Sequence, residues 1–291
     1  MTFDSMEERL LLSTVRIESL DDMRNPISIG TGFIIFCKIK EDGHKAYLVS
    51  NKHVLLESDY FRISFIKRRA SCNEPDLGKV STFRFQYSES YIALHPDEAV
   101  DVAVIDMTAF VELYHDSIFF RPLTYDMLAT CNEEFLHVSQ SVSFVGYPDD
   151  RYDIETNLPL MRSATIASPP SLDFNGERTF VVDGQIFPGS SGSPVMINIA
   201  REQWKAGKLP QRDIPEWLLL GIVSQTMVRY NELKNQKSSL IKLLAKNAHV
   251  AEVLGLGIIF KSTTIKETLD IAIQKFAEGD VHSIMMVWEE P

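Results

Sequence analysis

The chain has 291 residues, of which 45% are hydrophobic, and 29 Lys and Arg against 40 Asp and Glu give a formal net charge of −11. This length and composition predict one large packed domain or two smaller ones and exclude wholesale disorder. The acidic balance argues against a nucleic-acid partner, because phosphate backbones are bound by clustered Lys and Arg.

The cysteines and the first residues bear on the compartment. Cys37, Cys72 and Cys131 are odd in number and widely spaced, which argues against a disulfide framework. No Cys-x-x-Cys pair occurs, and we expect neither a metal nor another cofactor. The first residues are acidic rather than a basic segment before an apolar core, and no apolar run reaches membrane-spanning length. We therefore expect a cytoplasmic protein without a membrane partner.

Short strands follow one another in the first part of the chain. Residues 10–17 predict a strand, or a short helix leading into one. Residues 27–37 predict a strand interrupted by Gly30 and Gly32, where a bulge or a close backbone approach is expected. The Asp-Gly pair at 42–43 predicts a hairpin turn. Further strand patterns cover 46–50, 61–66, 82–87 and 101–106. These short strands without a long helix predict a β-barrel.

A second set of strands follows a mixed connection over residues 111–135, in which we expect some helix. Two segments interrupt this set, the polar residues 200–215 and residues 230–253, whose amphipathic pattern predicts a helical insertion. Residues 264–277 predict a closing helix. The strands themselves are expected over 141–148, 161–168, 179–183, 193–197, 218–225 and 256–260. The pattern predicts an all-β protein with a second barrel.

A Gly-rich turn between two of these strands reads Phe-Pro-Gly-Ser-Ser-Gly-Ser-Pro-Val and has Ser191 at its centre. Glycines let a substrate carbonyl approach main-chain N–H groups closely, as nucleophilic catalysis requires. Gly, Ser and Pro clusters are also ordinary turn chemistry, so this stretch alone leaves a plain loop open. Ser190 and Ser193 flank Ser191, but only Ser191 has the Gly-x-Ser-Gly position.

Two upstream residues favour the interpretation of Ser191 as a nucleophile over a plain loop. His53 follows a strand and Asp101 opens a buried strand, so the chain order is His, Asp, Ser. This order is that of the chymotrypsin-type proteases and differs from those of subtilisins and α/β-hydrolases. Asp106 competes with Asp101, but five residues further on it is expected on the opposite face of the strand.

Several blocks in order make the chain resemble the trypsin-like serine proteases, closest to HtrA-like and other bacterial trypsin-like peptidase domains without a PDZ domain. They lie at residues 30–33 (Gly-Thr-Gly-Phe), 48–54 (Leu-Val-Ser-Asn-Lys-His-Val), 101–104, 189–194, 221–224 and 255–260. The resemblance covers about residues 28–268. It implies two six-stranded antiparallel β-barrels of the chymotrypsin type, over 8–118 and 136–278, with a tail over 279–291.

The resemblance also implies an activity, that of a serine endopeptidase acting through an acyl-enzyme. His53 would move the proton of Ser191, and Asp101 would hold the imidazole. The N–H groups of Gly189 and Ser191 would form the oxyanion hole. Ser190 occupies the place where secreted digestive members have an Asp that pairs with a newly cut N-terminus. We therefore expect activity without zymogen cleavage.

The substrate-binding residues implied by the resemblance are Gln185, Ile186, Ser224, Gln225, Thr226 and Gly257. By this resemblance Gln185 lies at the base of the S1 pocket, which holds the P1 side chain before the cleaved bond. Ile186 is next to it, and Thr226 and Gly257 would line the walls. Ser224 and Gln225 would belong to the edge strand along which the substrate lies. No acid lies at the base, so we expect a medium-sized apolar or uncharged P1 residue rather than Arg or Lys.

Two other functions stay open, besides a non-peptide esterase as a minor third. One is a regulatory protease that a protein partner activates, for instance in a bacterial stress or defence pathway. The other is a catalytically silent module that captures an extended peptide along the Ser224 strand by β-addition. The expected partners are a protein or peptide substrate and, in the first case, a regulator. The insertions at 200–215 and 230–253 flank the substrate strand and are expected to shape specificity or to receive the regulator.

Overall fold

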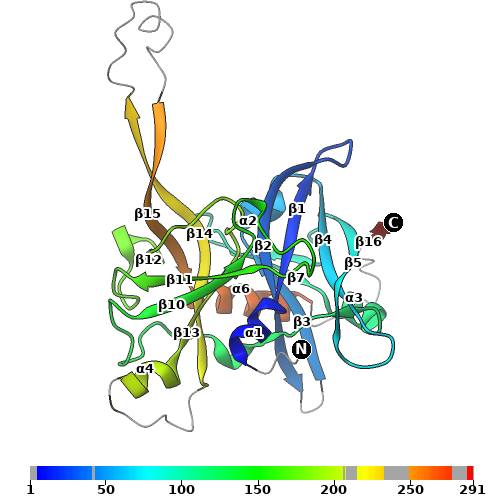
Figure 1. Ribbon diagram of the computed structural model, residues 1–291, viewed down its shortest axis with the longest axis horizontal. Helices are drawn as coiled ribbons and strands as arrows, with labels where there is room; N and C mark the ends of the chain where they lie inside the picture. The colour runs from blue at the N-terminus through cyan, green and yellow to red at the C-terminus, as the bar shows by residue number, and fades with distance from the viewer. Residues whose placement is uncertain are drawn as a thin grey trace, which may run out of the picture.

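The computed structural model of the chain describes residues 5–40, 43–205, 207, 215–232, 249–276 and 287–290. Two β-sheet units lie side by side, and helix α6 (Ser262–Lys275) lies between them (Figure 1). This helix contacts strands of both units. The all-β prediction and the closing helix are confirmed.

The first unit is a ten-stranded sheet, in which β8 pairs with β4 and β9 pairs with β2 beside the main path β16-β5-β4-β1-β2-β3-β7-β6. Its strands are β1 (Thr14–Leu20), β2 (Pro26–Lys40), β3 (Gly43–Ser50), β4 (Tyr60–Arg68), β5 (Pro75–Gln86), β6 (Ile92–Leu94), β7 (Ala103–Asp106), β8 (Ile118–Phe119), β9 (Leu123–Thr124) and β16 (Val287–Glu290). The six strands expected here are too few. The four further strands are β6, the short β8 and β9 within the connection over 111–135, and β16, which pairs with β5.

The second unit is a closed antiparallel barrel of six strands, as predicted. Its strands are β10 (Ser141–Gly146), β11 (Leu160–Ile166), β12 (Thr179–Asp183), β13 (Pro194–Asn198), β14 (Trp217–Glu232) and β15 (His249–Lys261), in the order β10-β11-β12-β15-β14-β13. Closure leaves the barrel without a free edge, because every strand has two neighbours.

Strands β14 and β15 continue beyond the barrel as a two-stranded ribbon that projects from the body (Figure 1). Residues 228–232 pair one to one with residues 249–253. The helix expected over 230–253 is therefore wrong at both ends, and its middle, 233–248, lies outside the described residues. Residues such as Val228, Tyr230 and Val250 favour strands, and ladder pairing with the partner strand outweighs the helical spacing.

The described helices are short apart from α6. They are α1 (Met6–Leu11), α2 (Lys52–Leu56), α3 (Thr108–Tyr114), α4 (Ile199–Lys205) and the single turns η1 (Tyr125–Met127), η2 (Pro148–Asp150) and η3 (Phe174–Gly176). Both alternatives for residues 10–17 are partly right, since α1 ends at Leu11 and β1 begins at Thr14. Across the described ranges, no helix is long and apolar enough to cross a membrane.

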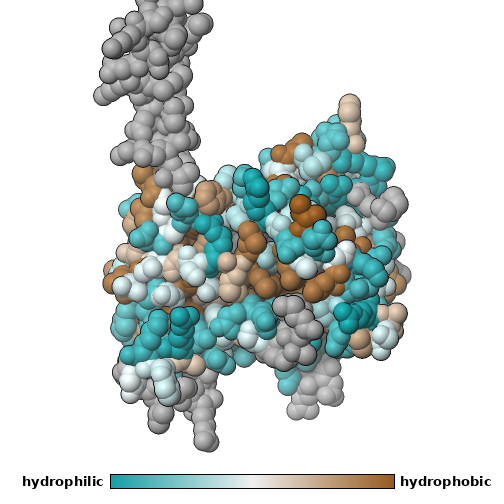
Figure 2. All heavy atoms as spheres, in the orientation of Figure 1, coloured by the Kyte–Doolittle hydropathy of each residue, from teal (hydrophilic) through white to brown (hydrophobic). Residues whose placement is uncertain are grey.

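A shared apolar core joins the two units. It combines Phe33 and Val49 of the first sheet with Met196 and Leu219 of the barrel and Leu269 of α6. Separate cores fill each unit. Fully burying one such side chain contributes about 1.5–3 kcal/mol, so the shared core holds one unit against the other. The outer face in Figure 2 is by contrast a mixture of polar and apolar patches.

Candidate active site

His53 and Asp101 meet at the end of the first sheet. His53 is on α2, directly after β3, and Asp101 lies in the loop between β6 and β7. Nδ1 of His53 is 2.6 Å from Oδ2 of Asp101, and the main-chain N–H of His53 donates to Oδ1 at 3.0 Å. A carboxylate only accepts, so Nδ1 carries a proton, and in the neutral imidazole Nε2 is then the acceptor. Asp106 instead lies 3.5 Å from Nζ of Lys45.

Asp101 is held from both units. The buried Asn51 donates from Nδ2 to the main-chain oxygen of Asp101 at 2.7 Å. The hydroxyl of Ser224, on β14, donates to Oδ2 of Asp101 at 3.3 Å. The pairing of β14 with β15 shifts register between Val223 and Gln225, so Ser224 occupies a β-bulge. Such a bulge turns a side chain out of the strand pattern, here toward Asp101.

The Ser191 turn lies between β12 and β13 and depends on two glycines. Gly189 and Gly192 have φ values of +84° and +88°, which disfavour any side chain. A Cβ at Gly192 would lie 1.7 Å from the oxygen of Thr31, and one at Gly189 would lie 2.3 Å from the oxygen of Tyr147. The glycines thus allow this turn to press against the first sheet and against the end of β10.

Two N–H groups of this turn are free to bind a substrate oxygen. Those of Ser190 and Gly192 donate to main-chain oxygens. Those of Gly189 and Ser191 make no hydrogen bond within the part of the chain that the structure describes. Unpaired N–H groups beside a nucleophile are the donors that stabilise an oxyanion.

Hydrogen bonds to neighbouring carbonyls orient these two N–H groups. In a trans peptide the C=O and N–H bonds point in opposite directions. The oxygen of Pro188 accepts from the N–H of Asp149 at 2.6 Å, so the N–H of Gly189 points the other way. The oxygen of Ser190 accepts from the N–H of Ser193 at 3.0 Å, so the N–H of Ser191 points away from that oxygen in the same manner.

The hydroxyl of Ser191 donates to the main-chain oxygen of Ser224 at 2.8 Å. Among the described residues, no hydrogen bond joins Ser191 to His53. The Ser191 hydroxyl is therefore bound to the main chain of β14 rather than to Nε2 of His53. The next residue of the strand, Gln225, is exposed.

Three of the residues expected at the S1 pocket lie together. Ile186 is 2% exposed, and a Cβ at Gly257 would lie 1.9 Å from its Cδ1. Thr226 pairs with Gly257 across the β14–β15 ladder and donates from Oγ1 to the oxygen of Leu256 at 3.3 Å. Gln185 is exposed. Ile186, rather than Gln185, fills the space beside Gly257.

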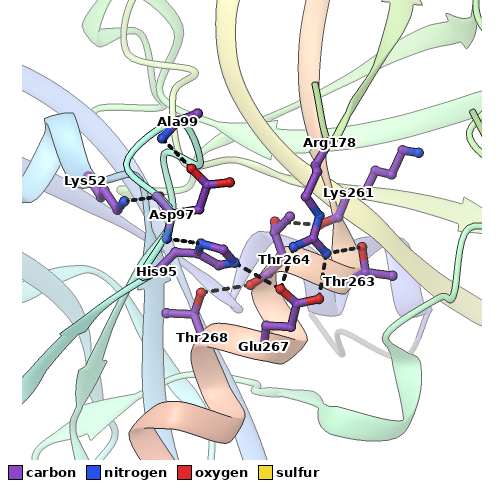
Figure 3. Close-up of polar contacts among 10 residues, drawn as sticks. All are labelled: Lys52, His95, Asp97, Ala99, Arg178, Lys261, Thr263, Thr264, Glu267 and Thr268. Carbon is purple, nitrogen blue, oxygen red and sulfur yellow. Dashed lines mark hydrogen bonds and ion pairs between the residues drawn. The ribbon is translucent and has the colours of Figure 1, made fainter. Parts of the chain in front are cut away.

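A polar network supports the Asp101 loop from the side of α6 (Figure 3). Nε2 of His95, whose side chain is 3% exposed, lies 3.1 Å from Oε2 of Glu267, and Nδ1 accepts from the N–H of Asp97 at 3.1 Å. The guanidinium of Arg178 donates hydrogen bonds to both carboxylate oxygens of Glu267, at 2.5 and 2.6 Å. Lys52 donates from Nζ to the oxygen of Asp97 at 2.8 Å.

The Arg178 hydrogen bonds are the main cause that lowers the pKa of Glu267 to about 2. The network thus ties α6 to the loop before Asp101 and to the residue before His53. The sequence alone indicates only that His95 lies in a turn. Its partners are too distant along the chain to leave a local pattern.

The cysteines have no role in this site. All three are free. Burial raises the pKa of Cys37 to about 12 and also raises that of Cys131, which keeps both thiols protonated and unreactive. Within the described ranges, no three His, Cys, Asp or Glu side chains gather to hold a metal ion.

Three solved structures are similar to this chain. Rv3671c from M. tuberculosis, in the inactive form of a Ser-to-Ala mutant, has 15% identity and a TM-score of 0.46, with 93% of this chain and 91% of that chain covered. The active form of the Rv3671c protease has 16% identity and a TM-score of 0.46, over 90% and 81%. A serine endoprotease from Yersinia pestis has 14% identity and a TM-score of 0.49, over 94% and 67%. Among curated proteins, none matches this chain.

The trypsin-like peptidase domain matches residues 30–201, which is more than half of the chain. The match includes the Gly-Thr-Gly-Phe block, the His53–Asp101 pair and the Ser191 turn. The chain therefore belongs to the trypsin-like peptidase family and is a serine protease.

Proposed function

We propose that this chain is a serine endopeptidase that uses His53, Asp101 and Ser191 as its catalytic triad and Gly189 and Ser191 as its oxyanion hole. The observation that carries the proposal is the 2.6 Å contact between His53 and Asp101 beside a turn with two N–H groups that have no partner among the described residues. A histidine oriented by a carboxylate is the base that a serine nucleophile needs.

The reaction would run in two halves. Oγ of Ser191 attacks the substrate carbonyl carbon, and Nε2 of His53 takes the hydroxyl proton. The N–H groups of Gly189 and Ser191 bind the oxyanion of the tetrahedral intermediate. The C–N bond then breaks, and the amine leaves with the proton from His53. Water, deprotonated by His53, hydrolyses the acyl-enzyme and releases Ser191.

We also propose that this activity needs no cut at the N-terminus. Ser190, the residue before the nucleophile, is 1% exposed and offers a hydroxyl rather than a carboxylate that a new amino terminus would pair with. The hydrogen bonds that the main-chain oxygens of Pro188 and Ser190 accept already orient the two N–H groups of the proposed oxyanion hole. Both features support a site that is assembled in the unprocessed chain.

A partner-activated protease is the second candidate, and one observation favours it. The Ser191 hydroxyl is bound to the Ser224 oxygen at 2.8 Å instead of facing His53 through a hydrogen bond. A regulator that moved β14 would release this hydroxyl. A substrate strand whose N–H donates to the Ser224 oxygen would also release the Ser191 hydroxyl, without a regulator.

Labelling with a fluorophosphonate probe tests the proposal. The full chain, its Ser191→Ala variant and Ser71→Ala, a substitution at an exposed loop serine, are compared by intact mass and by cleavage of unfolded casein. We expect one adduct and casein cleavage in the wild type and in Ser71→Ala, and neither in Ser191→Ala. The mass of the labelled wild-type protein also shows whether its N-terminus is intact.

Each other outcome separates the candidates. An adduct that persists in Ser191→Ala assigns the nucleophile to another residue. A wild-type chain that reacts only after cell extract is added supports partner activation. A wild-type chain that binds peptides along β14 but is never labelled under either condition supports a silent peptide-binding module.

A further inference from the structure

We propose that Thr31 is a positioning residue for the oxyanion hole, acting from the first sheet on the nucleophile turn of the barrel. The inference rests on the proposed function, because it requires Gly189 and Ser191 to be the oxyanion donors. Thr31 belongs to the Gly-Thr-Gly-Phe block on β2, and none of the roles assigned above uses it.

The Thr31 side chain joins two segments of the barrel. Thr31 is 0% exposed. Its hydroxyl donates to the main-chain oxygen of Gly189 at 2.8 Å and accepts from the N–H of Tyr147 at 3.3 Å. One hydroxyl therefore acts as the donor to Gly189 and as the acceptor from Tyr147.

The main chain of Thr31 is held as firmly as its side chain. Its N–H donates to the oxygen of Ser191 at 2.7 Å, and its oxygen accepts from the hydroxyl of Ser50 at 2.8 Å. Gly192 lies so close that a Cβ there would be 1.7 Å from the Thr31 oxygen. Thr31 thus binds the carbonyls of both residues whose N–H groups form the proposed oxyanion hole.

These contacts act on the orientation of the oxyanion donors. Gly189 has a φ of +84° and no side chain to restrict it, so its peptide groups rotate easily once an anchor is lost. Tyr147 belongs to the same turn as Asp149, whose N–H holds the Pro188 oxygen. The Thr31 hydroxyl therefore fixes Gly189 directly on one side and, through the 147–149 turn, on the other.

A matched pair of substitutions isolates the hydroxyl. Thr31→Ser keeps the hydroxyl and loses the methyl group, whereas Thr31→Ala loses both, so these two variants differ by the hydroxyl alone. Thr31→Val keeps the shape and removes the hydroxyl. Thr179→Val is the control, because Thr179 is 0% exposed and its Oγ1 has no hydrogen-bond partner among the described residues.

The variants are compared by kcat and KM on a peptide substrate and by melting temperature. Removing an oxyanion donor costs about 10²- to 10³-fold in kcat, and a misplaced donor costs part of that. We expect Thr31→Val and Thr31→Ala to lose about tenfold or more in kcat with KM within about twofold. Thr31→Ser and Thr179→Val are expected to keep kcat within about threefold of wild type.

Equal kcat in Thr31→Ser and Thr31→Ala would overturn the inference, as would a loss that lies wholly in KM. If Thr31→Val does not fold, the comparison of kcat between Thr31→Ser and Thr31→Ala still tests the role of the hydroxyl. The wild type and Ser191→Ala are measured alongside. A wild type as inactive as Ser191→Ala contradicts the proposed function, whereas an active wild type with unaffected Thr31 variants contradicts only the role of Thr31.

Discussion

Ile186 lies directly against Gly257, where an added Cβ would be 1.9 Å from Cδ1 of Ile186. Both residues are expected at the S1 pocket, and Thr226 pairs with Gly257 in the adjoining strand. An isoleucine in this place fills space and brings no charge. The pocket is therefore expected to be shallow and apolar.

The first prediction concerns the P1 residue. In a P1-scanning peptide library, the wild type should prefer small to medium uncharged residues, and Ile186→Ala should shift the preference toward larger ones such as Leu or Phe. The substitution opens a cavity in the core and should also lower the free energy of unfolding by about 2–5 kcal/mol. A wild-type preference for Arg or Lys would contradict this assignment of the pocket.

The second prediction concerns the partner of His53. Asp101→Asn replaces the acceptor of the His53 Nδ1 proton with an amide, which favours the wrong imidazole tautomer. We expect kcat to fall by roughly 10³- to 10⁴-fold while the melting temperature changes little. Asp106→Asn is the control, since Asp106 contacts Lys45 and the amide of Thr108. Comparable losses in the two variants would leave the role of Asp101 unsupported.

The third prediction concerns Gly192, the glycine after Ser191. Gly192 and Gly176 both have left-handed backbones, with φ of +88° and +80°. A Cβ at Gly176 meets nothing within 4 Å, whereas one at Gly192 would lie 1.7 Å from the Thr31 oxygen. Gly176→Ala should therefore cost only the left-handed strain, about 1–2 kcal/mol. Gly192→Ala should cost clearly more and abolish activity.

Urea unfolding of the two alanine variants, followed by fluorescence, measures this difference. Equal midpoints would show that the turn can move away from the first sheet without loss, contrary to the close packing of Gly192 against Thr31.

The fourth prediction concerns acid stability. The pKa of Glu267 in the folded protein is about 2, against 4.5 as its ordinary value, because Arg178 and His95 bind the charged form. A lowered pKa contributes stability that is complete above about pH 4.5 and is lost as the pH falls toward 2. Glu267→Gln should thus lower the melting temperature at pH 7 but hardly at pH 2.

The expected effect is small, because the Glu267 side chain is 48% exposed and solvent screens its ion pairs. Glu112→Gln, at an exposed position on α3, should show no such pH-dependent difference. A gap between wild type and Glu267→Gln that stayed constant from pH 7 to pH 2 would refute the charge-based explanation.

Local patterns along the chain predict much of the fold. Short runs of apolar and β-branched residues predict β10 and β12, and the helical spacing of apolar residues predicts α6. The blocks around His53, Asp101 and Ser191 indicate the chemistry, because each motif is short and contiguous. The ribbon of residues 228–232 and 249–253 is missed, since its pairing partner outweighs the helical spacing.

The sequence by itself predicted most of the strands, the family and the three residues proposed for catalysis, because these depend on neighbours along the chain. Only the tertiary structure decided what holds the site. The Thr31 hydroxyl on Gly189, the Asp149 amide on Pro188 and the His95–Glu267 contact each join segments far apart in sequence. Two of them end on main-chain atoms, which every residue carries, so no residue type marks them before the chain is folded.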